Sequence, residues 1–168
     1  EFFEITRFNL SHITLDISRI NLTRMLEQLI FEFGPMLTEK GLMCCLDARP
    51  DIMVRIDADK MQRVFDNLLR NAVNYSFENS TINIYAECIG KDVRLVFENM
   101  GDTIPEDKLE RIFEQFYRLD TARTTKNGNA GIGLAIAKEI VELHGGSIKA
   151  ASKDERISFE VILPIKDN

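Results

Sequence analysis

The segment from residue 58 to residue 76 constrains the fold most, because two helical patterns run along it together. Asn67, Asn71 and Asn74 follow the spacing i, i+4, i+7 and share one stripe of the predicted helix. Asparagine is a weak helix former, so this stripe indicates selection for something other than helix stability. An amide coordinates a hard cation through its oxygen and donates hydrogen bonds through its nitrogen, and a bound metal–nucleotide needs both. The second pattern is apolar and predicts a buried face: Met61, Val64, Phe65, Leu68, Ala72 and Tyr75.

The rest of the chain mixes helices and strands without strict β-α-β alternation. Pro35 kinks or divides the helix predicted over 21–40, and Gly90-Lys91 is the turn of a predicted hairpin. We therefore expect an α/β two-layer sandwich, with a mixed sheet and helices on one face. The predicted strands cover 13–20, 42–48, 53–56, 81–88, 92–99, 148–151 and 157–163, and the further helices cover 106–116 and 132–144.

Two glycine-containing segments have the chemistry of ligand sites. A predicted strand ends at Asn99, and Gly101 follows, which permits a sharp turn and the close approach of a flat ligand. Taken alone, this pattern is also that of an ordinary strand-ending turn. Gly128, Gly131 and Gly133 lead into an apolar helix, whose exposed N–H groups can bind phosphate. The spacing of these glycines matches neither a Walker loop nor a Rossmann fingerprint.

Composition excludes several classes of protein. The formal net charge of −6 argues against a surface that coats nucleic acid, although a metal ion still permits a small anionic ligand. Three cysteines, two of them adjacent, do not form a secreted disulfide framework or a zinc site. The sequence has no long apolar run and no signal peptide, so we expect a cytoplasmic location. The start without Met predicts a fragment of a longer protein.

Four segments, taken in order, resemble the ATP-binding domain of sensor histidine kinases, within the wider family that includes gyrase and MutL. Residues 66–72 resemble its N box, 99–101 its G1 box, 112–119 its F box and 128–134 its G2 box. The resemblance covers nearly the whole chain and implies the Bergerat-type ATP-binding fold with a long ATP lid over 100–130. The amino-acid sequences of residues 2–8 and 137–141 are also similar to those of the VanS-type sensors of vancomycin resistance.

The resemblance implies a site for ATP and Mg²⁺. Asn71 would coordinate Mg²⁺ and, with Arg118 of the lid, would be a catalytic residue. Asn67 would contact the phosphates, and Tyr75 would lie against the adenine. Asn74 stands where many relatives carry a phosphate-binding lysine. The remaining nucleotide contacts would come from Asn99, Gly101, Ile104, Tyr117, Gly128, Gly131, Ile132, Gly133 and Leu134.

The sequence departs from the family pattern at several of these positions. Asn99 stands where most relatives have an adenine-reading aspartate, and its oxygen can still accept from the adenine amino group. Thr103 and Asn129 each replace a glycine. The final glycine-threonine box is missing, and residues 156–159 occupy its place. These departures bear on nucleotide affinity more than on the fold.

The family's phosphoacceptor histidine lies in a helical box and has no counterpart here, because His12 adjoins a predicted strand and His144 lies at a helix C-terminus, where a cation is mildly favoured. We expect residues 1–10 to be the tail of a missing helical dimerisation and phosphoacceptor region, and 11–168 to be the catalytic domain. The implied function is transfer of the ATP γ-phosphoryl group to that histidine, for relay to a response regulator, by the cytoplasmic part of a membrane sensor. We expect a monomeric fragment.

Two alternatives stay open on the sequence alone. One is a degenerate, non-catalytic module that docks a partner, which Asn74, Asn99 and the missing last box favour. The other is an ATPase domain of the gyrase or MutL type. The aromatic lid and the lack of a water-activating acidic residue within the asparagine helix argue against it.

Overall fold

The computed structural model describes residues 14–115, 117 and 133–165. The described elements follow in this order: β1 (Ser18–Asn21), α2 (Leu22–Glu32), α3 (Gly34–Glu39), β2 (Met43–Ala48), β3 (Met53–Ile56), α4 (Ala58–Tyr75), β4 (Thr81–Ile89), β5 (Asp92–Met100), η1 (Glu106–Lys108), η2 (Arg111–Phe113), α6 (Gly133–Leu143), β6 (Ser147–Lys153) and β7 (Arg156–Pro164).

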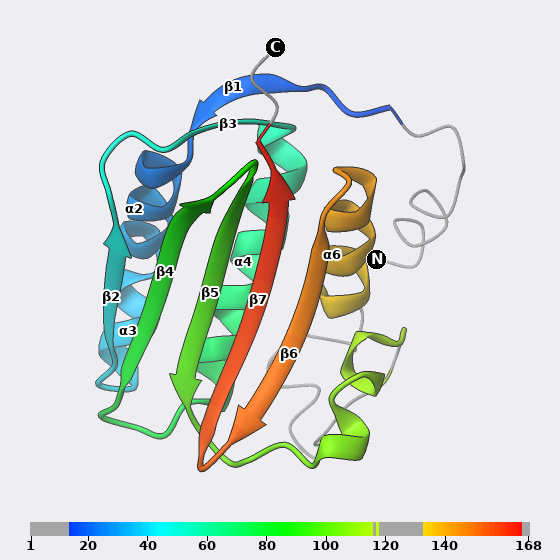
Figure 1. Ribbon diagram of the computed structural model, residues 1–168. Coiled ribbons are helices and arrows are strands. Elements are labelled where there is room, and N and C mark those ends of the chain that lie inside the picture. The colour runs from blue at the N-terminus through cyan, green and yellow to red at the C-terminus, as the bar shows by residue number, and fades with distance from the viewer. Residues whose placement is uncertain (1–13, 116, 118–132, 166–168) are drawn as a thin grey trace.

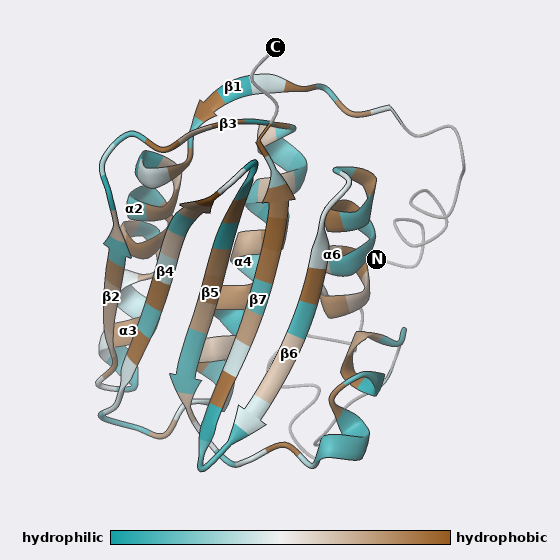
Figure 2. Cartoon of the chain, in the orientation of Figure 1, coloured by the Kyte–Doolittle hydropathy of each residue, from teal (hydrophilic) through white to brown (hydrophobic). Residues whose placement is uncertain are grey.

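The predicted two-layer α/β sandwich is confirmed. Five strands form one sheet in the order β2-β4-β5-β7-β6, in which β2 and β4 are parallel and the other neighbours antiparallel. The helices α2, α3, α4 and α6 all cover the same face of this sheet (Figure 1). Polar and apolar residues alternate along the central strands (Figure 2), as expected for a sheet with one face on the core and one in solvent. A separate antiparallel pair, β1 and β3, crosses one end of the molecule.

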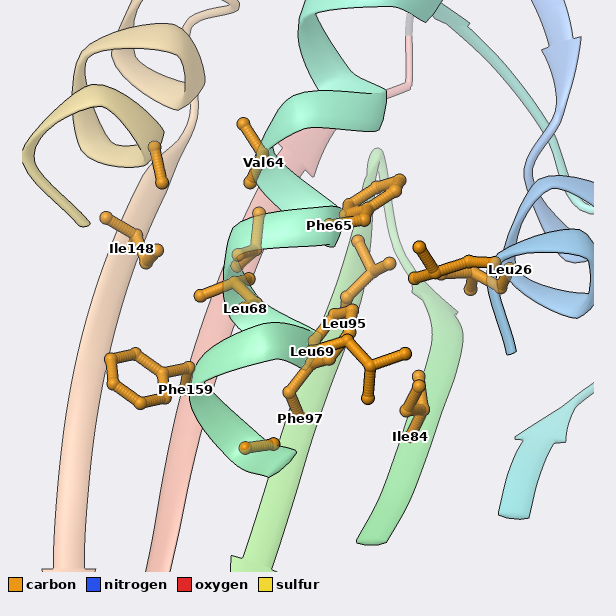
Figure 3. Close-up of a cluster of buried hydrophobic side chains, with 14 of the residues drawn as sticks. Leu26, Val64, Phe65, Leu68, Leu69, Ile84, Leu95, Phe97, Ile148 and Phe159 are labelled. Carbon is orange, nitrogen blue, oxygen red and sulfur yellow. The ribbon is translucent and has the colours of Figure 1, made fainter. Parts of the chain in front are cut away.

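The hydrophobic core lies between the sheet and α4, which packs between α2 and α6. The ring of Phe65 on α4 stacks on Phe97 of β5, with ring centroids 6.1 Å apart (Figure 3). Leu69 and Val73 are also buried, so the apolar face is wider than the predicted one. Tyr75, which is predicted on this face, is 38% exposed. It is the last residue of the helix, where the sheet no longer covers the predicted stripe.

The predicted division of the helix over 21–40 is confirmed, because α2 and α3 are separate helices and Pro35 lies in the first turn of α3, where its missing N–H is tolerated. Two other predicted boundaries are wrong. The predicted strand over 13–20 is β1 alone in the described part, where only residues 18–21 pair with β3. The predicted helix over 106–116 consists of two short 3₁₀ turns, η1 and η2.

The first residue before α4, Asp57, joins three parts of the chain. Its carboxylate caps the helix by accepting from the Lys60 N–H (3.1 Å) and also accepts from the Asp16 N–H (2.9 Å). Burial raises the pKa of this carboxyl, but the two N–H groups and the Lys60 charge outweigh it, so the pKa lies below its usual value.

The Asp57 N–H donates to Nε2 of His144 (3.0 Å), and Nδ1 of His144 lies 2.8 Å from the Ile140 oxygen. Since Nε2 accepts, the ring proton is on Nδ1 and the imidazole is neutral. His144 is therefore a buried residue that directly follows α6, in agreement with the helix C-terminus predicted for it, and it joins this end to Asp57. Among the described residues, no helix combines the length and apolar character needed to cross a membrane.

Candidate nucleotide site

The asparagine stripe occupies the second half of α4 and is bound into the structure. Asn67 is half-buried, and its Nδ2 donates to the carbonyl oxygen of Gly133, the first residue of α6 (3.1 Å). This bond ties the predicted phosphate-binding helix start to the stripe. Asn74 is half-buried and follows the buried Asn71 by about one helical turn. The structure thus brings Asn67, Asn71 and Gly133 together at one end of the helix layer.

Asn71 is positioned by a bond within its own helix. Only 6% of the residue is exposed, and its Nδ2 donates to the Asn67 carbonyl oxygen four residues back (2.9 Å). Because the nitrogen is held against the helix backbone, the side-chain oxygen is turned away from that carbonyl. An amide oxygen presented in this way is the group that a hard cation prefers.

The C-terminal end of α4 is fixed by Lys40, which sequence reasoning missed. Its ammonium donates to the carbonyl oxygens of Val73 (2.8 Å), Asn74 (3.3 Å) and Ser76 (3.0 Å). A cation at this point satisfies the last carbonyls of the helix and complements its dipole. Lys40 therefore positions Asn74 and Tyr75. No sequence pattern signals this role, since the contact joins residues more than thirty positions apart.

Asn99 is the most unusual polar residue of the described structure. It lies at the end of β5 on the helix-facing side, in line with Leu95 and Phe97, and is 3% exposed. Its Nδ2 is the buried side-chain polar atom of the described residues that has no hydrogen-bond partner. Leaving such a group unpaired costs about 1–3 kcal/mol. Such orphan donors are rare in native structures, and a bound ligand, ion or water molecule is the usual partner.

Gly101 brings the end of β5 against the end of α4. A Cβ at this position would lie 2.3 Å from the Tyr75 carbonyl oxygen and 3.2 Å from Nδ2 of Asn99. Only glycine permits this approach without moving one of the two backbones. Asn99, Gly101 and Tyr75 therefore form a second cluster, at the same end of α4 as the asparagine stripe.

The loop after Gly101 is fastened to the β6–β7 hairpin. The Gly101 N–H donates to the Glu155 oxygen (3.0 Å), and the Glu155 N–H donates to Oγ1 of Thr103 (2.8 Å). The N–H of the buried Ile104 donates to Oγ of Ser152 (2.8 Å). Thr103, which departs from the family glycine, thus makes a specific contact with the hairpin just before the place of the missing glycine-threonine box.

The predicted F box contributes two aromatic side chains to the described structure. Phe113 is buried edge-on against Phe159 of β7, with ring centroids 6.0 Å apart. Tyr117 is half-buried, and the Arg111 guanidinium lies 4.6 Å from the centre of its ring. Gly133 and Leu134 open α6. Other predicted site residues lie outside the described residues: Arg118, Gly128, Gly131 and Ile132.

The described residues offer no alternative site with the chemistry of a nucleotide or metal site. A cavity lined by Leu15, Arg55, His144 and Leu163, among others, lies by the β1–β3 pair, at the end of α6 that is remote from Gly133. No cluster of three or more His, Cys, Asp or Glu side chains that could hold a metal occurs within 14–115, 117 and 133–165. The candidate site is therefore the amide-lined end of α4.

Comparison with known proteins shows the family to which the chain belongs. Residues 56–167 match the family model described as "Histidine kinase-, DNA gyrase B-, and HSP90-like ATPase". The chain is 51% identical over 164 residues to the sensor protein VanS of Enterococcus faecium, which is 98% of this chain and 42% of that protein. It spans less than half the length of the curated relatives that match most of it.

Solved structures extend the comparison to three dimensions. The catalytic domain of the histidine kinase ThkA superposes with a TM-score of 0.81 at 27% identity, covering 90% of this chain and 97% of that domain. ThkA in complex with the response regulator protein TrrA gives 0.82 at 25% identity, covering 98% of this chain and 46% of that one. The family model, the 51% identical relative and the superposed catalytic domain indicate the same family. The chain belongs to the family of histidine kinase-, DNA gyrase B- and HSP90-like ATPases.

Proposed function

We propose that this chain is the catalytic, ATP-binding domain of a sensor histidine kinase. It transfers the γ-phosphoryl group of ATP to a histidine on a separate domain, for relay to an aspartate on a response regulator. The observation that carries the proposal is the amide cluster in the second half of α4, where Asn67 is bonded to the start of α6 and the nitrogen of Asn71 is bonded to the helix backbone. The named relative is a sensor protein, and ThkA is a histidine kinase.

Asn71 is the proposed ligand of Mg²⁺, and this role fits an amide whose nitrogen is bonded to the helix backbone and whose oxygen is turned away from that bond. When bound, the metal ion supplies charge neutralisation for the phosphates. Asn67 holds the first turn of α6 close to the stripe, which brings the free N–H groups of that turn toward the same region. Arg118 and the glycines Gly128 and Gly131 remain predictions for the phosphate contacts, and Tyr117 for the lid.

The base is proposed to lie at the second cluster. Asn99 offers a buried amide without a partner for its nitrogen, and Gly101 allows the strand end to lie close to the end of α4. Tyr75, which is partly exposed at the helix end, supplies an aromatic surface. Lys40 keeps this end of the helix in place. The two clusters lie along one helix, so phosphates and base would bind along the second half of α4.

The proposal places the phosphoacceptor histidine and the dimer interface in a separate helical region of the longer protein. The response regulator is the proposed downstream partner, in line with the ThkA–TrrA complex. The chain would be the cytoplasmic part of a membrane sensor, and isolated it would be a monomer. Phosphoryl transfer between domains requires only that the catalytic domain position the nucleotide and neutralise its charge.

The test is calorimetric titration with a non-hydrolysable ATP analogue, with and without Mg²⁺. We expect Mg²⁺ to strengthen binding at least tenfold, and Asn71→Ala to abolish that Mg²⁺ dependence. The matched control is Asn83→Ala, the same change on β4, which is expected to bind like the unaltered protein. Absence of binding at millimolar nucleotide would overturn the proposal and favour a partner-docking module. Full Mg²⁺ dependence in Asn71→Ala would remove Asn71 as the metal ligand.

A further inference from the structure

The buried amide of Asn99 lacks a partner for its nitrogen, and this has a consequence for which nucleotides bind. Nδ2 is enclosed and makes no hydrogen bond with any described residue. A donor in that position must find its acceptor outside the described residues, in a ligand or in a water molecule that a ligand can displace. Gly101 lies directly beside this nitrogen, and a side chain there would crowd it, because its Cβ would lie 3.2 Å from Nδ2. A flat ring that brings a hydrogen-bonding edge to this point would satisfy the amide.

The amide presents one acceptor and one donor side by side, and purine bases offer two complementary edges. Adenine carries an N–H donor at position 6 beside an acceptor at N1. Hypoxanthine and guanine carry an oxygen acceptor at position 6 beside an N–H donor at N1. An amide pairs with either edge after a half-turn about its last bond, making two hydrogen bonds each time. An ionised carboxylate only accepts hydrogen bonds. Its oxygen would face the 6-oxo oxygen of the base with no hydrogen between them, and the two oxygens would repel each other.

We propose that Asn99 is a specificity-determining residue that lets this site accept 6-oxopurine as well as 6-aminopurine nucleotides. The inference rests on the proposed function, because it assumes that a purine nucleotide occupies the cluster of Asn99, Gly101 and Tyr75. It goes beyond that function because it assigns the base selectivity of the site to one side chain. Asn99→Asp, which removes the donor and leaves the shape nearly unchanged, is expected to restore selectivity for adenine.

The test compares ADP with inosine diphosphate, both with Mg²⁺, by calorimetric titration. Inosine diphosphate changes the hydrogen-bonding edge and adds no other group, and neither nucleotide can donate a γ-phosphoryl group during the measurement. We expect the two dissociation constants of the unaltered protein to agree within tenfold. In Asn99→Asp, inosine diphosphate is expected to weaken at least tenfold more than ADP. Asn83→Asp, on the outer face of β4, is the matched control and is expected to change neither.

The outcomes separate the two proposals. If the unaltered protein binds ADP but prefers it more than tenfold over inosine diphosphate, the inference fails and the proposed function stands. An unchanged ratio in a folded Asn99→Asp protein, checked by circular dichroism, also overturns the inference. If Asn99→Asp does not fold, the ratio measured on the unaltered protein decides alone. Binding of neither nucleotide at millimolar concentration overturns both proposals.

Discussion

Replacing Gly101 by alanine tests whether the contact between β5 and α4 builds the nucleotide site. The added methyl carbon would lie 2.3 Å from the Tyr75 carbonyl oxygen, whereas ordinary contacts are 3.4–4 Å. The strand end and the helix end must therefore separate by about 1 Å. Both are backbone, so no side-chain rotation relieves the overlap. We expect a loss of about 1–3 kcal/mol in the free energy of unfolding, as for other overpacked sites.

The same movement would displace Tyr75 and place a methyl group beside the Asn99 amide. We expect nucleotide affinity to fall at least tenfold, which corresponds to about 1.4 kcal/mol. Urea unfolding and calorimetric titration measure the two effects separately.

Gly90→Ala is the matched control for this substitution. Gly90 has a φ of +58° and open space around it, so alanine there costs backbone strain of about 1–2 kcal/mol. It lies in the β4–β5 turn, at the far end of β5 from Asn99, and nucleotide affinity should not change. Equal nucleotide affinities in Gly101→Ala and the unaltered protein would refute the reasoning, because they would mean that the approach of Gly101 to Tyr75 does not shape the site.

Two further predictions concern stability. Asp57→Ala removes the cap of α4 and should cost about 1 kcal/mol at pH 7 by urea unfolding. Because the folded-state pKa of Asp57 is lowered, its stabilisation is present above about pH 4 and is lost as the pH falls through the folded-state pKa. The difference between the two proteins should therefore shrink below pH 4, and a constant difference would contradict the cap's charge dependence. Glu155 has a φ of +62° in the β6–β7 turn. Glu155→Gly should raise the melting temperature through relief of about 1 kcal/mol of strain, while Glu155→Ala should not.

The sequence predicted α4 and its stripe well because two periodic patterns coincide on one helix. The pattern could not show where the sheet stops covering that helix, so Tyr75 was placed in the core. The Gly90 hairpin followed from local turn chemistry. The β6–β7 turn had no such signal, since Asp154 and Glu155 adopt positive φ without a glycine.

Long-range contacts were beyond sequence reasoning. Lys40 binds the end of α4, and His144 accepts from the Asp57 N–H, 87 residues away in the chain. Neither residue belongs to a periodic pattern, and only the folded arrangement gives these side chains their partners. The same holds for Thr103, which stands where the family has a glycine. Its hydroxyl accepts from the Glu155 N–H and so joins the loop after β5 to the β6–β7 turn.

The uninterrupted course of α4 limits how this chain can change in length. The helix has 18 residues, so at a rise of 1.5 Å per residue it is about 27 Å long. Its first turn is fixed by Asp57 and its last by Lys40. One residue inserted between Asp57 and Asn67 would turn the asparagine stripe by about 100° relative to the helix start and detach Asn67 from Gly133. Substitutions on the exposed side of α4 should therefore be tolerated far better than any insertion or deletion within it.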